Sequence, residues 1–91
     1  MKLRWSPEAA DDFAQIIHHI REENPTAALR VAQRISENIA GLKRFPRLGR
    51  PGRVGETREL ILSPLPFIVV YRIQDEIVEI ARVLHGAQRW P

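Results

Sequence analysis

The sequence predicts an α+β fold: a short N-terminal strand, an antiparallel two-helix hairpin, then a three-stranded antiparallel meander packed on the helices. Three observations predict it. Two segments with apolar residues at helical spacing occupy the first half, a loop rich in proline and glycine follows them, and three strand-like runs fill the second half. A chain of 91 residues is large enough for one small core, so we expect a single domain over residues 1–91.

The first helix is predicted to begin after Ser6, behind a short strand at residues 2–5. The Ser6 side chain can cap exposed amides, Pro7 has the backbone angle of a first helical position, and Glu8 suits the positive end of the helix dipole. Apolar residues then recur at helical spacing, which predicts an amphipathic helix. This stripe consists of Ala10, Phe13, Ile16, Ile17 and Ile20.

The helical pattern breaks at Asn24-Pro25, where Asn24 can cap a second helix whose first turn begins with Pro25. Because the connection is so short, the two helices must be antiparallel neighbours. Small alanines on the inner face of the second helix allow a close approach. That face carries Ala28, Val31, Ala32, Ile35, Ile39 and Leu42.

Positive charge is concentrated in residues 43–58. This segment has six basic residues and one acidic residue, a net charge of +5, whereas the whole chain carries +3. Two prolines and three glycines within residues 45–55 predict a long loop. A local positive field attracts nucleic acid or an acidic protein segment. The alternative is a solvated arginine-rich loop that maintains solubility.

Three strand-like runs follow at residues 56–63, 67–73 and 77–84, with short separators that predict antiparallel pairing. In the last run, side chains alternate between the two faces of the sheet. We expect its more apolar side, Val78, Ile80 and Leu84, to pack on the helices. Arg82 then lies near the edge of the packed face.

Composition restricts the classes of function. No apolar run approaches the ~20 residues that span a bilayer. The N-terminus has no stretch of signal-peptide length, and the chain contains no cysteine, so a cytoplasmic protein without disulfides is expected. His18 and His19 are adjacent on a predicted helix and point about 100° apart, so they cannot share a metal ion. We expect neither a metal site nor a cofactor.

The C-terminal half carries the groups that are able to cleave RNA without a metal. Such a reaction needs a base, an acid and cations that stabilise the transition state. His85 can act as acid or base, although a histidine at a strand end is as often a structural hydrogen-bonding residue. Trp90 can stack on a base or pin the C-terminal tail to the domain. The candidate cations are Arg58, Arg72, Arg82 and Arg89.

Six short segments follow one another in a characteristic order. They are Ser6-Pro7-Glu8-Ala9, Pro25-Thr26-Ala27-Ala28, Phe45-Pro46-Arg47-Leu48-Gly49, Thr57-Arg58-Glu59-Leu60, residues 66–72 and residues 82–91. In this order, over nearly the whole chain, they resemble the RelE/ParE superfamily of bacterial toxins from type II toxin-antitoxin modules. The resemblance implies a RelE/ParE-like fold and a small cytoplasmic toxin, of the kind linked to plasmid stabilization. It also implies inactivation by a cognate antitoxin, whose extended tail wraps the helical hairpin and the sheet edge in a hetero-oligomer.

The resemblance also implies two sets of contact residues. For the antitoxin we expect Phe13, Ile17, Ile20, Ile35 and Ile39. For the target or a nucleic acid we expect Arg47, Arg50, Arg53, Arg72, Arg89 and Trp90.

Within the superfamily, ParE-like members inhibit DNA gyrase, whereas RelE-like members cut mRNA on the ribosome. Phe67 stands where the RelE-like pattern has a strand-opening arginine, and no tyrosine follows Arg82. The ending, with His85, Arg89 and Pro91, is more similar to the ParE branch. We therefore expect a ParE-like, non-enzymatic inhibitor of DNA gyrase.

Two alternatives stay open. One is a RelE-like ribosome-dependent mRNA endonuclease, with His85 as acid or base and with Arg58 and Arg82 as phosphate clamps. The other is an inactive relative that retains only antitoxin binding. Only the first of these alternatives is an enzyme, and the sequence leaves undecided whether the protein is one.

Overall fold

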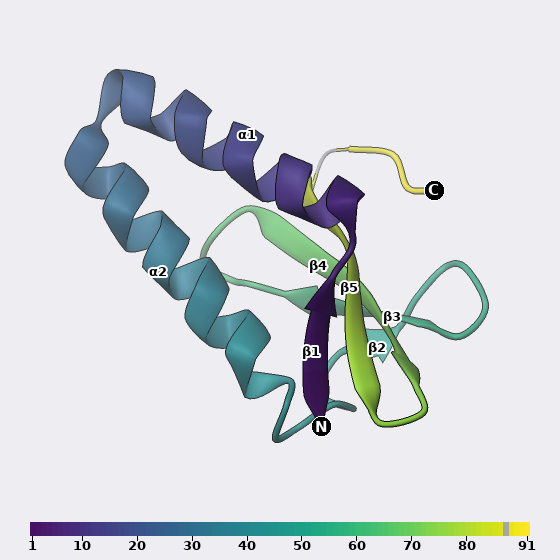
Figure 1. Cartoon of the computed structure of the whole chain (residues 1–91). Helices are drawn as coiled ribbons and strands as arrows, with labels where there is room; N and C mark the ends of the chain where they lie inside the picture. The colour runs from purple at the N-terminus through teal and green to yellow at the C-terminus, as the bar shows by residue number, and fades with distance from the viewer. Residues whose placement is uncertain (87) are drawn as a thin grey trace.

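The computed structural model describes residues 1–86 and 88–91, and in it two helices cover one face of a five-stranded sheet (Figure 1). This arrangement confirms the predicted α+β class, with its N-terminal strand and helical hairpin. The elements in chain order are β1 (Lys2–Trp5), α1 (Pro7–Glu23), α2 (Pro25–Gly41), β2 (Arg50–Pro51), β3 (Thr57–Ile61), β4 (Phe67–Gln74) and β5 (Ile77–His85).

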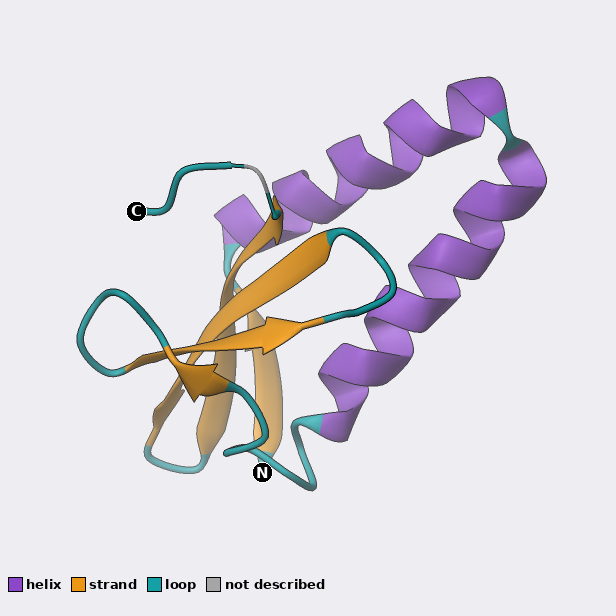
Figure 2. Cartoon of the chain, turned by 180° about the vertical axis from the view of Figure 1, so that it is seen from behind, coloured by secondary structure: helices purple, strands orange, loops and turns teal. Residues whose placement is uncertain are grey.

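Both helices begin at the predicted caps. The hydroxyl of Ser6 accepts a hydrogen bond from the Ala9 amide at 3.0 Å, and Oδ1 of Asn24 accepts one from the Ala27 amide at 3.0 Å. Each bond satisfies an amide that has no partner within its own helix. The two helices meet at Asn24 and separate from the sheet toward that end, so the tip of the hairpin projects beyond the strands (Figure 2). Among the described residues, no helix is both long and apolar enough to cross a bilayer.

The sheet contains two strands more than the predicted meander, in the order β1-β5-β4-β3-β2. β1 joins it by parallel pairing with β5, from Lys2 opposite Ile77 to Trp5 opposite Ile80. β2 lies inside the segment predicted to be an irregular loop, and it pairs antiparallel with β3. A two-residue strand that contains a proline has no detectable alternation, and proline is tolerated there because β2 is an edge strand. β3 is also shorter than the predicted run of residues 56–63.

The core lies between the helices and the inner face of the sheet. Ala9, rather than the predicted Ala10, is the fully buried residue of α1. On α2 the inner face is largely as predicted. Its buried members Ala28, Ile35 and Ile39 are joined by Leu42 just beyond the helix.

A β-bulge changes which residues of β5 face the helices. Tyr71 pairs with Ile80, but the preceding Val70 pairs with Arg82, so Ala81 is an extra residue in β5. Val78, Ile80 and Val83 therefore belong to the core cluster. Leu84 was expected on that face, but it lies on the opposite one, where it shares a pocket with Ile68 and Val70.

Candidate functional site

The arginine-rich loop of residues 45–55 follows α2 and is called the basic loop below. It is fixed to the sheet by the hydroxyl of Tyr71, a fully buried residue of β4. This hydroxyl accepts a hydrogen bond from the Gly49 amide at 2.8 Å and donates one to the Pro46 carbonyl at 2.7 Å. Nη1 of Arg58, on β3, donates to the Gly49 carbonyl at 2.7 Å and to the Arg47 carbonyl at 3.4 Å. Three of the six characteristic segments thus meet at one place and define the path of the loop.

The Tyr71 anchor requires glycine at position 49. A Cβ atom on Gly49 would lie 2.7 Å from the Tyr71 hydroxyl and 2.9 Å from the Glu59 carbonyl, closer than side chains are found. Burial raises the pKa of Tyr71, while the hydrogen bond from Gly49 and the charge of Arg58 oppose this shift. The phenol is therefore neutral and able to donate to Pro46. The sequence contained one signal that we missed: a tyrosine on a central strand needs a hydrogen-bond partner for its hydroxyl.

The predicted target-binding arginines of the loop differ in how firmly they are held. Nη2 of Arg50 lies 2.9 Å from Oε1 of Glu59, a carboxylate whose side chain is only 7% exposed. A buried carboxylate needs such a partner, so Arg50 has a structural task. Arg47 and Arg53 are exposed, and Nη1 of Arg53 contacts the carbonyl of Trp90 at 3.5 Å.

Arg82 is held by the N-terminal part of α1. Its Nε and Nη2 atoms lie 2.7 and 3.0 Å from the two carboxylate oxygens of Asp12. The same carboxylate accepts a hydrogen bond from the Val83 amide at 3.0 Å. The hydrogen bond to Asp12 raises the pKa of Arg82, so the guanidinium stays charged. Arg82 and Asp12 thereby tie helix α1 to strand β5.

His85 lies at the end of β5, opposite Phe67 of β4, and the two rings meet edge-on with 5.9 Å between their centroids. Arg58 lies opposite Tyr71, which is four residues beyond Phe67 on β4. The positions of His85 and Arg58 are therefore separated by roughly 13 Å along the strand direction. Arg82 is turned toward Asp12. The three residues of the nuclease alternative are therefore not brought together around one point.

His85 does share a small pocket with other arginines. This pocket, of about 40 Å³, lies on the sheet face opposite the helices. It is lined by Arg50, Arg53, Glu59, Ile68, Val70, Leu84, His85, Gly86, Gln88 and Trp90. The half-buried Trp90 therefore packs beside the sheet, as the tail-pinning interpretation expects. Position 87 of the C-terminal segment lies outside the described residues.

The chain matches the sequence profile of the ParE toxins of type II toxin-antitoxin systems, of the parDE kind, over residues 3–90. It belongs to the ParE toxin family. The chain is thus a toxin of a type II toxin-antitoxin system, within the RelE/ParE superfamily, as the sequence segments had predicted.

Individual relatives of this ParE-family chain agree with this family assignment. It is 41% identical to Y4kP of Sinorhizobium fredii, named as a toxin, over 99% of the chain and 93% of the relative. It is 32% identical to toxin RelE2 of Caulobacter vibrioides, over 92% of the chain and 93% of that relative. A chromosomal ParDE system from P. aeruginosa contains a chain with a TM-score of 0.85 and 31% identity, with 93% of this chain and 95% of that one covered. A YoeB/ParE toxin from Agrobacterium tumefaciens has the same fold, with a TM-score of 0.64, 19% identity, and coverage of 93% and 98%.

A groove of about 650 Å³ runs beside α1 in this ParE-family toxin. Ile16, Ile20 and Phe67 supply its apolar lining, together with Ala14. Polar residues complete the lining: Gln15, His18, His19, Glu22 and His85. Nε2 of His18 lies 3.4 Å from a carboxylate oxygen of Glu22. Among the residues that the structure describes, no group of three or more side chains is arranged to hold a metal ion.

The residues predicted to contact the antitoxin fall into two groups. Ile35 and Ile39 are 0% and 1% exposed in the core, so a partner that docks on the folded toxin does not reach them. Their helical spacing marks an apolar face, but it cannot tell a face that binds a partner from one that packs on the sheet. Ile20 lines the groove, Ile17 is half-buried, and Phe13 packs against Trp5 at 5.5 Å between ring centroids.

The two remaining predicted target-binding arginines lie apart from the loop. Nε of Arg72, on β4, is 3.8 Å from Oε1 of Glu79. Glu79 also contacts Arg4 at 3.2 Å, so the half-buried Glu79 and the exposed Arg4 and Arg72 form a charge cluster on the outer face of the sheet. Arg89 is exposed in the C-terminal tail.

Proposed function

We propose that this ParE-family toxin inhibits DNA gyrase by binding, without catalysing a reaction itself. In this proposal it is a single-domain cytoplasmic protein that its cognate antitoxin neutralises in a hetero-oligomer. The target surface is formed by the loop arginines Arg47, Arg50 and Arg53 together with the tail residues Arg89 and Trp90. Arg72 lies on the same outer face of the sheet.

One observation carries the choice of binding over catalysis. The guanidinium groups of Arg58 and Arg82 are already engaged, by the carbonyls of the basic loop and by Asp12. Cations that stabilise a phosphorane-like transition state must be aimed at the place where charge develops. Arg58 and Arg82 instead bond to the chain itself, at separate places, and this supports a structural role for both.

The basic loop is suited to recognition because its backbone is fixed before a target arrives. The bonds from Tyr71 and Arg58 hold residues 46–49, and the β2–β3 pairing holds residues 50–51. Binding to a preformed loop costs less conformational entropy than ordering a flexible one. The net charge of +5 over residues 43–58 would steer the toxin toward an acidic surface or toward the DNA that gyrase holds.

The groove beside α1 is the surface that we assign to the antitoxin. Its apolar lining from Ile16, Ile20 and Phe67 offers the kind of pocket in which a hydrophobic anchor is buried. Disordered acidic-hydrophobic segments can fold into such a groove. The similarity to a chain of the chromosomal ParDE toxin-antitoxin system from P. aeruginosa supports a partner of this kind.

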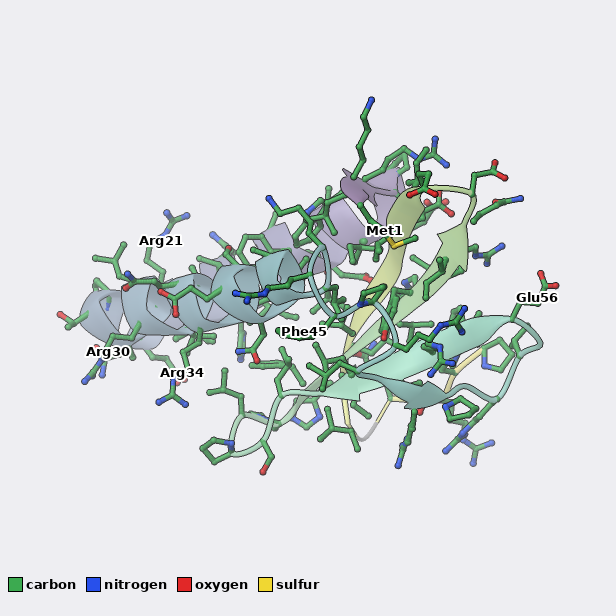
Figure 3. The ribbon with its side chains drawn as sticks, turned by 90° about the horizontal axis from the view of Figure 1, so that it is seen from below. Met1, Arg21, Arg30, Arg34, Phe45 and Glu56 are labelled. Atoms are coloured by element: carbon green, nitrogen blue, oxygen red, sulfur yellow. The ribbon has the colours of Figure 1, made fainter. Side chains whose placement is uncertain are left out.

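Supercoiling of relaxed plasmid by purified gyrase tests the proposal. We expect the toxin to block supercoiling, and we expect Arg47→Gln/Arg53→Gln to weaken inhibition. The matched control is Arg30→Gln/Arg34→Gln, which removes the same charge from the exposed surface of α2 (Figure 3). His85→Ala should inhibit as well as the unmodified toxin. Full gyrase activity at excess toxin, without cleaved DNA, would contradict the proposal.

A ribosome-dependent mRNA endonuclease is the second candidate, and one observation favours it: His85 shares a pocket with Arg50 and Arg53. In this version those two arginines, rather than Arg58 and Arg82, would supply the charge next to the acid or base. It predicts cut transcripts in a translating extract and their loss with His85→Ala. Intact mRNA from a toxin that stops growth would reject it.

A further inference from the structure

The indole nitrogen of Trp90 is a buried hydrogen-bond donor without an acceptor among the residues that the structure describes. An indole N–H can only donate, and burying it without a partner costs free energy. The other buried side-chain nitrogen and oxygen atoms of the described residues all have partners. An unpaired donor in such a setting is a group that a ligand with an acceptor oxygen would complete.

Contacts of the C-terminal tail hold the indole in a defined position. His85 and Gln88 close a turn, because the His85 amide donates to Oε1 of Gln88 at 2.6 Å and the Gln88 amide donates to the His85 carbonyl at 2.9 Å. Nη1 of Arg53, in the basic loop, contacts the Trp90 carbonyl at 3.5 Å. The donor therefore has a fixed place beside the sheet before any ligand arrives.

Trp90 lines the pocket of about 40 Å³ on the outer face of the sheet, and the charges of this pocket favour an anion. Its charged side chains are Arg50, Arg53 and Glu59, which together carry a net charge of +1. Glu59 is already paired with Arg50 at 2.9 Å. The charge of Arg53 is thus available to an anion that accepts from the indole. His85 adds positive charge when it is protonated.

The volume and the walls of the pocket select among anions. A cavity needs roughly 10–15 Å³ to hold one water molecule, so 40 Å³ has room for about three groups of that size, the number of heavy atoms in a carboxylate. Ile68, Val70 and Leu84 form apolar walls that suit the methylene stem of an acidic side chain. A phosphate in a nucleic acid carries a sugar on two sides, which hinders its entry into so small a pocket.

We propose that this pocket is a subsite for one carboxylate, that of a glutamate or aspartate side chain on the protein that the toxin binds as its target. The carboxylate accepts a hydrogen bond from Nε1 of Trp90 and pairs with Arg53, while its stem packs on Val70 and Leu84. This inference rests on the proposed function, because it names the chemical group of the target that the C-terminal tail recognises.

The test uses the full toxin and three small probes: butyrate, its neutral amide butyramide, and dimethyl phosphate, which mimics a nucleic-acid backbone. NMR follows the indole N–H resonances of the two tryptophans, and Trp5, which packs against Phe13 of α1, is the internal control. We expect butyrate to shift the Trp90 resonance saturably and to leave that of Trp5 in place. Butyramide should bind at least about tenfold more weakly, because hydrogen bonds to charged groups are the stronger ones.

Two results of this titration would overturn the inference. One is a Trp90 resonance that does not respond to butyrate, or that responds equally to butyramide. The other is tighter binding of dimethyl phosphate than of butyrate, which would indicate a site for a nucleic-acid backbone.

Side-chain variants test the two groups that hold the carboxylate. Trp90→Phe keeps an aromatic ring in the pocket and removes the donor, so it should weaken butyrate binding by at least about tenfold, as read at the Gln88 amide. Arg53→Gln should weaken it as well. Arg30→Gln is the matched control, since it removes an exposed arginine of α2, and it should leave binding unchanged. Unchanged binding by Trp90→Phe would refute the donor role.

The gyrase assay separates this inference from the proposed function. If both hold, Trp90→Phe weakens inhibition of supercoiling. A toxin that binds butyrate through Trp90 but leaves gyrase fully active would contradict the proposed function and support the carboxylate subsite. Undiminished inhibition by Trp90→Phe would overturn the subsite and leave gyrase as the target.

Discussion

Replacing Tyr71 with phenylalanine removes one oxygen atom and nothing else from the anchor of the basic loop. The ring stays in the core, so the hydrophobic contribution is nearly unchanged. Two backbone groups lose their partner: the Gly49 amide, which is buried, and the Pro46 carbonyl, which is half-buried. The substitution therefore isolates the energy of the two hydrogen bonds.

The magnitude follows from the exposure of these two groups. A buried polar group left without a partner costs about 1–3 kcal/mol. The Gly49 amide should carry most of that cost, whereas the Pro46 carbonyl can regain water in part, so we expect about 2–4 kcal/mol for Tyr71→Phe. A domain of 91 residues has about 5–14 kcal/mol of total stability. The variant should fold, with a melting temperature lowered by about 10 °C or more.

Urea unfolding of the two proteins measures the difference in free energy. Native-state hydrogen exchange at the Gly49 amide then shows whether the loop has come loose. Because the loop forms the proposed target surface, Tyr71→Phe should also weaken gyrase inhibition at temperatures where the fold is intact. A free energy of unfolding within about 0.5 kcal/mol of the unmodified toxin would refute the anchor, since surface changes without structural consequence fall in that range.

Three further predictions follow from the same contacts. Asp12→Ala should lower the free energy of unfolding in urea titrations by about 1.5–3 kcal/mol, because the Asp12 carboxylate accepts hydrogen bonds from Arg82 and from the Val83 amide. Asp11→Ala is the control, since Asp11 is exposed, and it should change the free energy of unfolding little. Gly49→Ala should destabilise the toxin because its Cβ meets Tyr71, while Gly41→Ala, with open space around the new methyl, should cost nothing; thermal melts compare the pair. At alkaline pH, the raised pKa of Tyr71 means that its contribution to stability is complete below about pH 10 and is lost as the pH rises through the folded-state pKa. As the only tyrosine, it can be followed directly by tyrosinate absorbance, and Tyr71→Phe should lack this part of the alkaline loss.

Local signals in the sequence predicted most elements, because their causes lie within a few residues. Ser6 and Asn24 cap the helices at the predicted positions, and the turn at residues 75–76 separates two strands close to their predicted ranges. The errors arose where distant segments decide the outcome. The bulge at Ala81, which sent Leu84 to the outer face, depends on the pairing of β5 with β4. The strand β2 exists only because β3 is there to pair with it.

The candidate site was less accessible to sequence reasoning than the fold. An arginine looks the same in a sequence whether it meets a target or a carbonyl of its own chain. Both arginines have partners within the chain. Arg58 bonds to carbonyls that lie 9 and 11 positions earlier in the sequence, and Arg82 bonds to Asp12, 70 positions earlier. Pairing over such distances leaves no periodic trace. Likewise, spacing identified Ile35 and Ile39 as an apolar face, but it could not show that the sheet covers them.

The measurement that tests the central claim most directly is the amount of gyrase trapped covalently on plasmid DNA as purified toxin is added. A binding inhibitor of gyrase predicts that the amount of trapped gyrase rises and that supercoiling falls as toxin increases, with the same dose dependence for His85→Ala and with reversal by the cognate antitoxin. The contradictory result is unchanged supercoiling and no trapped gyrase at excess toxin, together with transcripts that are cut in a translating extract only when His85 is present.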